Sequence, residues 1–248
     1  MKTVVVTGVA GGIGAATAAL FSREGWRVIG IDAIEPDRDR FCDKFIKTDL
    51  SDESEILRLF STVSGFCGSI QALVNNAAYQ LCKTLLDTEC DEWDLLMRVN
   101  LRAVFLMMKS AHPLLRQGNG SIVNIGSVHA LATSQNIAAY AASKGGLQVL
   151  TRSAALEFAR DGIRVNCVHP GAIDTEMLRR GLSRGHLAAA DADSLLLALA
   201  GKTVMGRIGT PEEISQAVFF LADNQRSSFI TGQHLVVDGG ATARLSTE

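Results

Sequence analysis

The chain has 248 residues, of which 47% are hydrophobic and 20% are charged, so it can bury the core of one large α/β domain or two small ones. The net charge is −2 and no basic block is present, which argues against nucleic acid as the main partner. No apolar run reaches the roughly 18 residues that a membrane-spanning helix needs, so we expect no membrane partner.

Short apolar segments alternate with amphipathic ones along the chain. The expected strands are 3–6, 27–31, 45–47, 72–75, 121–126, 164–168 and 234–237. The expected helices are 13–24 (closed by Gly25), 51–63 (capped by Ser51), 91–116, 138–160 and 211–222 (opened by Pro211). This alternation predicts parallel strands with right-handed crossovers. We expect one α/β domain over 1–248, a doubly wound, Rossmann-type and mostly parallel sheet of about seven strands with helices on both faces.

The N-terminus allows two interpretations. Lys2, an apolar stretch and the small residues 16–18 resemble a signal peptide. The alternative is a buried strand, a glycine turn and a helix. Four glycines between positions 8 and 14 would weaken a signal helix, and cleavage there would remove the glycine turn, so the second interpretation is favoured.

The cysteines and histidines are scattered. Five cysteines, an odd number, include no Cys-x-x-Cys pair, which indicates reduced thiols in a cytoplasmic protein. The five histidines are equally dispersed, so the sequence predicts no metal site. The cysteines are Cys42, Cys67, Cys82, Cys90 and Cys167.

The glycine turn from Thr7 to Gly14 follows an expected strand and opens an expected helix, which is the context of a dinucleotide-binding turn. Glycines let the backbone approach a pyrophosphate, and the helix N-terminus offers free N–H groups. The alternative is an ordinary tight turn. The candidate cofactor contacts here are Gly8, Gly12, Ile13 and Gly14.

Asp32 ends the second expected strand. A carboxylate there can bind both ribose hydroxyls and would repel a 2′-phosphate, and the turn itself contains no Arg or Lys. We therefore expect NAD rather than NADP. A solvated carboxylate at a strand end is the alternative.

Tyr140 and Lys144 are four residues apart in an expected helix, so their side chains share a face. An ammonium beside a phenol lowers the pKa of the phenol from about 10 toward working pH. A phenol tuned in this way can take a proton from an alcohol or give one to a ketone. With the glycine turn, the pair predicts hydride transfer on a carbonyl or an alcohol, although a single Tyr-x-x-x-Lys is weak evidence.

The ordered set of motifs resembles the short-chain dehydrogenase/reductase family over nearly the whole chain. Two positions differ from the commonest family pattern: Ala78 stands in place of a glycine, and Gly126 in place of a second serine. Both replacements are small for small. The matching segments are 7–14, 49–50, 75–78, Asn100, 126–127, 140–144, 170–171 and 237–240.

The resemblance implies a role for each residue of the set. Tyr140 would be the general acid/base, and Lys144 would tune it and hold the nicotinamide ribose. Ser127 would hydrogen-bond the substrate oxygen, and Asn100 would lie at a break in its helix and hold a water that links Lys144 to solvent. Singly, each residue also fits an ordinary structural role. The other implied cofactor contacts are Asp49, Leu50, Asn76, Ala77, Ala78, Pro170, Gly171, Ile173 and Thr175.

Two features bear on the substrate. His129 is two residues past Ser127 and either faces the pocket or packs elsewhere. The insertion 174–208 contains the apolar run 195–199, which is either a lid over the site or a contact with another subunit. The insertion favours a cyclic or medium-sized apolar alcohol, while residues 127–129 also resemble sugar dehydrogenases of the family, which leaves a sugar or polyol open.

The expected function is NAD-dependent interconversion of a secondary alcohol and a ketone. The alternatives are an NADP-linked ketoreductase and a non-catalytic dinucleotide-sensing module on the same fold. The apolar residues of 91–116 and 138–160 exceed what one sheet face needs, and the family pairs these helices across subunits. We therefore expect a homotetramer, with a dimer as second choice.

Overall fold

The computed structural model describes residues 1–36, 41–182 and 192–243. Its strands form one sheet in the order β3-β2-β1-β4-β5-β6-β7, and every neighbouring pair is parallel. This confirms the doubly wound, Rossmann-type sheet of seven strands. The strands are β1 (Thr3–Thr7), β2 (Arg27–Asp32), β3 (Lys44–Lys47), β4 (Ala72–Asn75), β5 (Ser121–Ile125), β6 (Arg164–Pro170) and β7 (His234–Val237).

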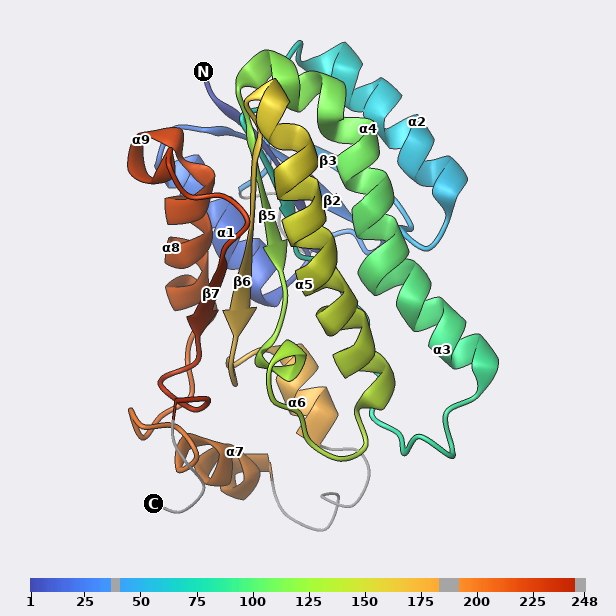
Figure 1. Ribbon diagram of the computed structural model, residues 1–248, viewed down its shortest axis with the longest axis vertical. Helices are drawn as coiled ribbons and strands as arrows, with labels where there is room; N and C mark the ends of the chain where they lie inside the picture. The colour runs from blue at the N-terminus through green and yellow to red at the C-terminus, as the bar shows by residue number, and fades with distance from the viewer. Residues whose placement is uncertain (37–40, 183–191, 244–248) are drawn as a thin grey trace.

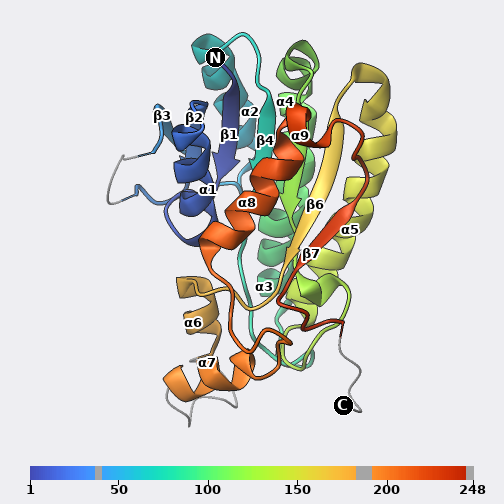
Figure 2. The same ribbon diagram turned by 90° about the vertical axis from the view of Figure 1, so that its left-hand side faces the viewer.

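Helices cover both faces of the sheet (Figures 1 and 2). One face carries α1 and α8, which pack on each other, and the other carries α2, α4 and α5. The helices are α1 (Gly12–Arg23), α2 (Glu53–Phe66), α3 (Cys90–Met97), α4 (Ala103–Gly118), α5 (Ala138–Phe158), α6 (Glu176–Leu182), α7 (Ala192–Ala200), α8 (Pro211–Ala222) and α9 (Asn224–Ser227).

The unbroken apolar run of β1 follows from this layering. Val4 and Val6 join the core under α1 and α8, while Val5 joins the core under α2 and α4. All three valines are fully buried. A strand covered on both faces needs apolar residues at every position, and that need is what made the strands readable in the sequence.

The N-terminus of α2 differs from the expectation. Asp52, not Ser51, is the capping residue, and its side chain accepts a hydrogen bond from the backbone N–H of Ser54 at 2.7 Å. Either residue type satisfies a free N–H at a helix start, so sequence alone could not choose between adjacent candidates. The helix also runs on to Phe66 rather than ending near Val63.

The expected helical region 91–116 is not continuous. It consists of α3, a π-helical turn over Arg98–Arg102, and α4. The π turn widens the helix at Asn100, where the family resemblance implied a break. Such turns are rare and concentrate at functional sites.

Parts of the insertion 174–208 are helical, which was not predicted. It holds α6 and α7, while residues 183–191 lie outside the described part of the chain. The apolar run 195–199 falls within α7. Figure 1 places α6 and α7 beyond the carboxyl ends of β5, β6 and β7, where ligands bind in open α/β sheets.

The described residues also bear on membrane insertion and on the state of the cysteines. Within the described residues, no helix combines the length and apolar character that a membrane crossing requires. All five cysteines lie in that part of the chain, and each is a thiol rather than half of a disulfide.

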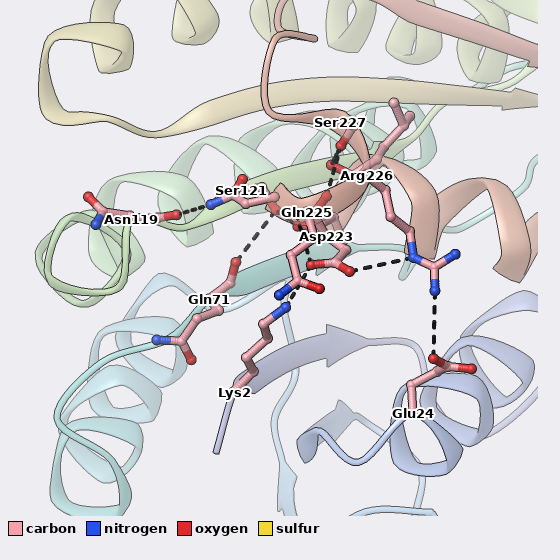
Figure 3. Close-up of polar contacts among 12 residues, drawn as sticks. Lys2, Glu24, Gln71, Asn119, Ser121, Asp223, Gln225, Arg226 and Ser227 are labelled. Carbon is pink, nitrogen blue, oxygen red and sulfur yellow. Dashed lines mark hydrogen bonds and ion pairs between the residues drawn. The ribbon is translucent and has the colours of Figure 1, made fainter.

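A polar cluster at the amino ends of the strands joins Lys2, which precedes β1, to the segment between α8 and α9 (Figure 3). The buried carboxylate of Asp223, just after α8, accepts from Lys2 Nζ at 2.7 Å, and Arg226 Nε lies 3.5 Å from its second oxygen. Burial raises the pKa of this carboxyl, but hydrogen bonds from Lys2 and the Gln225 N–H lower it more, so the net pKa is lowered. The cluster thereby fixes α8 to the start of β1.

We predict that Asp223→Asn lowers the melting temperature by about 3–10 °C, because a buried charge-assisted hydrogen bond is lost. Because folding lowers the pKa of Asp223, its ionised form stabilises the fold at pH values above the ordinary carboxyl pKa. This stabilisation is lost as the pH falls and the carboxyl protonates. The gap between the two proteins should therefore shrink below about pH 4. Calorimetry across pH measures both effects.

The matched control is Glu24→Gln. Glu24 is exposed and lies 3.9 Å from Arg226, so it should leave the melting temperature nearly unchanged. An equal loss in both variants would contradict the assignment.

Candidate active site

The turn between β1 and α1 depends on glycine at two kinds of position. Gly8 and Gly12 have φ angles of 75° and 55°, which side chains rarely adopt. Gly14 is needed for closeness instead, because a Cβ there would lie 1.9 Å from the carbonyl oxygen of Gly8. Gly11 is the N-cap of α1 and has no side chain to bond the first N–H groups, so these point outward as donors for an anion.

Asn76, which follows β4, holds this turn in place. Its Nδ2 donates to the carbonyl oxygens of Thr7 at 2.9 Å and Gly8 at 3.2 Å. The hydroxyl of Thr7 accepts in return from the N–H groups of Asn76 and Ala77 at 2.9 and 3.0 Å. Hydrogen bonds therefore connect the glycine turn after β1 to the segment after β4, and both segments contain predicted cofactor contacts.

Asp32 lies at the carboxyl end of β2 beside the glycine turn. Its Oδ2 accepts from the N–H of Ala10 at 2.9 Å, and its Oδ1 accepts from the N–H of Ile34 at 3.1 Å. Further along the same edge, Asp49 Oδ1 accepts from the N–H of Ser51 and Leu50 is buried. Asp32 thus ends β2, while Asp49 and Leu50 follow β3.

The segment after β6 closes the other side of the turn. Gly171 continues from Pro170 and donates its N–H to the carbonyl of Val237 at 3.0 Å. Ile173 is buried, and the methyl carbon of Thr175 lies 3.1 Å from where a Cβ on Gly12 would be. Residues more than 160 positions apart in the sequence therefore face each other across one cleft edge.

Tyr140, Lys144 and Ser127 converge where β5 and α5 meet. Lys144 Nζ donates to the carbonyl of Ile125, the last residue of β5, at 2.8 Å and lies 5.5 Å from the ring centre of Tyr140. Ser127 follows β5 directly and hydrogen-bonds the phenol. Tyr140, Ser127 and Lys144 are all buried.

The expected tuning of the phenol is wrong for the polypeptide by itself. Burial raises the pKa of Tyr140 to about 12, and the hydrogen bond with Ser127 offsets only part of this. Burial also lowers the pKa of Lys144 to about 8, partly offset by nearby Cys167. Removing both groups from water disfavours both charged forms, and burial is the largest cause of both pKa shifts.

Asn100 is buried in the π turn and its amide is fully used. Its Oδ1 accepts from the N–H of Tyr79 at 2.7 Å, while Nδ2 donates to the Tyr79 carbonyl at 2.8 Å and to Ser143 Oγ at 3.2 Å. Ser143 precedes Lys144, so Asn100 connects the loop after β4 to the part of α5 that carries Lys144. The water-holding role stays a prediction.

His129 lies beside the catalytic residues. Its ring centre is 6.0 Å from that of Tyr140, with the planes at 82°. Its N–H donates to Ser127 Oγ at 3.2 Å, its Nδ1 lies 3.2 Å from Thr133 Oγ1, and burial lowers its pKa. The ring of His129 therefore adjoins that of Tyr140, and its place in a substrate pocket stays a prediction.

Sequence reasoning missed a second group under the site. Cys167 and His169 are two positions apart on β6, so their side chains point to the same face of the sheet. His234, on the neighbouring strand β7, pairs with Cys167 and so lies on that face as well. Their ligand atoms lie within 4.8 Å of one another. Strand periodicity could have placed Cys167 with His169, but only the pairing of β6 with β7 brings His234 to them.

Comparison with known proteins identifies the family. A family model described as Enoyl-(Acyl carrier protein) reductase matches residues 8–242. Cyclopentanol dehydrogenase of Comamonas testosteroni is 37% identical over 98% of this chain and 97% of its own, and trans-4-hydroxycyclohexanecarboxylate dehydrogenase of Sinomonas cyclohexanicum is 34% identical over 98% and 93%. The chain belongs to the short-chain dehydrogenase/reductase family.

A solved structure agrees with this assignment. The ligand-free aldohexose dehydrogenase of Thermoplasma acidophilum matches with a TM-score of 0.93 and 34% identity over 99% of this chain and 95% of that chain. Short-chain dehydrogenase/reductases use a nicotinamide dinucleotide. The residues here fit one, because outward N–H groups at α1 suit a pyrophosphate and the carboxylate of Asp32 suits ribose hydroxyls.

Proposed function

We propose that this short-chain dehydrogenase/reductase interconverts a secondary alcohol and a ketone with NAD, and that Tyr140 is the general acid/base. The convergence of Ser127, Tyr140 and Lys144 beside the glycine turn is the observation that carries this proposal. A module that only senses a dinucleotide would need the turn but not this set. One domain holds both halves of the site.

The residues divide the chemistry as follows. The nicotinamide, when bound, exchanges the hydride with the substrate carbon and, in its oxidised form, brings a positive charge. A positive charge near a phenol lowers the pKa of the phenol, which opposes the effect of burial on Tyr140. Ser127 orients the substrate oxygen, Tyr140 moves its proton, and Lys144 holds the ribose and supports the phenolate.

For the substrate, we favour a cyclic secondary alcohol of medium size. Two relatives are named for cyclic alcohols, and apolar residues Leu81 and Ile137 pack around Tyr140. The helices α6 and α7 lie beyond the strand ends, where a lid would close over such a substrate (Figure 1). A sugar is the competing class, since one structural neighbour is an aldohexose dehydrogenase.

For assembly, we propose a homotetramer. A groove of about 920 Å³ runs between the helices 91–118 and α5, lined by Leu101, Phe105, Val149 and Leu150. Phe105 and Val149 are 46% and 54% exposed. A second apolar surface, at the β7 side, includes the fully exposed Phe229. A tetramer needs two kinds of two-fold interface, and we assign the groove to one and the region of Phe229 to the other.

For location, we propose the cytoplasm. The five thiols within the described residues suit a reducing compartment, where disulfides rarely persist.

We expect turnover with NAD and cyclic secondary alcohols such as cyclopentanol or cyclohexanol. The apolar residues Leu81 and Ile137, which share a core cluster with Tyr140, offer no partners to sugar hydroxyls, so glucose should be a poor substrate. A panel of cyclic alcohols, linear alcohols and aldohexoses, followed by NADH absorbance, tests this. Activity only on aldohexoses would reverse the substrate assignment, and no turnover on any alcohol would reject the proposed function.

We predict that NAD is preferred over NADP by more than about tenfold in kcat/KM, because Asp32 would repel a 2′-phosphate. Asp32→Ala should reduce this preference, because it weakens the binding of NAD and removes the repulsion of the 2′-phosphate of NADP. Steady-state kinetics with both cofactors measure the ratio. Equal efficiency of the unmutated enzyme with both cofactors would contradict the prediction.

We predict that Tyr140→Phe lowers kcat by at least about 100-fold while the Kd of NAD changes little, because only the proton carrier is removed. Alcohol oxidation by the unmutated enzyme should rise with pH, since the phenolate is the active base and its pKa is raised toward 12 by burial. The residual activity of the variant should lose that rise. Retention of most turnover in Tyr140→Phe would show the mechanism to be wrong.

We predict that Val149→Glu converts the tetramer into a smaller species, because a charge would be buried in the groove interface. Light scattering at micromolar concentration measures the mass. Leu57→Glu is the matched control, since Leu57 is also 54% exposed but lies on α2, outside the groove. An unmutated monomer, or an unchanged mass in Val149→Glu, would count against this assembly.

A further inference from the structure

The group Cys167, His169 and His234 has the composition of a metal site, but its hydrogen bonding does not suit one. The backbone N–H of Ser127 donates to Nδ1 of His169 at 3.0 Å, so Nδ1 carries no proton. A neutral imidazole then carries its proton on Nε2. With Nδ1 engaged and Nε2 protonated, His169 has no lone pair left for a cation, and a cation would have to break the bond to Ser127.

The pKa of His169 agrees with a neutral ring. Burial, followed by the charges of His234 and Lys144, lowers its pKa to about 4. The ring is therefore neutral near pH 7. Its side chain is fully buried, and the polar group it satisfies is the N–H of Ser127.

We propose that His169 is a positioning residue that fixes the backbone of Ser127 and so aims the Ser127 hydroxyl at the substrate oxygen, and that residue 126 is glycine to make room for this ring. The proposal rests on the proposed function, since it assigns a supporting role in the same site.

The space around Gly126 carries the second half of the proposal. A Cβ on Gly126 would lie 2.3 Å from Nδ1 and 2.6 Å from Cε1 of His169, the two closest contacts, and 2.8 Å from Sγ of Cys167. Gly126 cannot move away easily, because its N–H donates to the carbonyl of Val168 at 2.8 Å. A serine here, as in the commonest family pattern, would displace the ring, so Gly126 and His169 form a matched pair.

The ring is held from its other side as well. His169 lies on β6 opposite Val236 of β7 and stacks on His234, with ring centres 5.3 Å apart and planes at 23°. Ser127 is thus fixed at its N–H by His169, while its hydroxyl accepts from the N–H of His129. Loss of the first bond would leave a buried N–H unpaired, which favours rotation of the Ser127 backbone toward another acceptor.

The test compares His169→Asn with His169→Leu. Both side chains branch at Cγ and both lose the ring, but only the asparagine places an oxygen acceptor near the position of Nδ1. We expect His169→Leu to lower kcat for alcohol oxidation by about tenfold with KM for NAD nearly unchanged, and His169→Asn to recover most of that loss. Equal losses in the two variants would overturn the proposal.

Two controls separate positioning from general packing. His234→Leu replaces the stacked ring by an apolar side chain that still covers His169 and removes no bond to Ser127, so it should lower the melting temperature and leave kcat near that of the unmutated enzyme. In a Ser127→Ala background, His169→Leu should have little further effect on kcat, because no hydroxyl remains to be aimed. A full tenfold loss in that background, or in His234→Leu, would overturn the proposal.

A separate pair of variants tests the contact between Gly126 and His169. Gly126→Ala should lower kcat in the unmutated background and lower it less in His169→Ala, where the ring is absent. Equal effects in both backgrounds would contradict the matched pair.

Failure of the proposed function can be told apart from failure of this inference. If the unmutated enzyme turns over no alcohol, the proposed function fails. Hydrogen exchange of the Ser127 amide then still decides the positioning role: it should be slow in the unmutated protein and in His169→Asn, and faster in His169→Leu. Equal exchange in all three would reject the bond.

Discussion

The close approach of Gly14 to the carbonyl of Gly8 is the constraint on which the site depends. Any side chain at position 14 would push the start of α1 away from the end of β1. Asn76 can reach the carbonyls of Thr7 and Gly8 only while the turn is this tight, and through Asn76 the turn is connected to β4. The donors of α1 and the loops after the central strands therefore take their positions from one contact between backbone atoms.

Tyr140 and Lys144 are positioned by side-chain contacts rather than by a close approach of backbone atoms. Tyr140 and Lys144 come from α5, and the carbonyl of Ile125 at the end of β5 receives the ammonium. Asn100, from the π turn, connects Tyr79 to Ser143 on the same helix. Contacts from β5 and from the π turn thus fix the rotation of α5, which matters because a helix that turned about its axis would carry Tyr140 and Lys144 away from Ser127.

The sequence was sufficient for the sheet, because strand burial is a local property, and motif order named the residues Ser127, Tyr140 and Lys144 that lie together near the end of β5. It could not choose Asp52 over Ser51 as a cap, since adjacent residues of similar chemistry compete. It also gave the wrong direction for the pKa of Tyr140: spacing shows that Lys144 is near, but the cost of burial depends on everything packed around both groups. The meeting of His169 with Gly126 depends on the pairing of β5 with β6, which no local pattern states.

The burial of Lys144 has a consequence for how such an enzyme can evolve. An ammonium held out of water, with a pKa lowered to about 8, makes the folded chain less stable than an apolar side chain of the same length would. Selection for thermal robustness alone would replace it, whereas selection for turnover would retain it if Lys144 has the role proposed above. Directed evolution that screens for heat resistance without an activity screen should therefore drift toward inactive variants at this position.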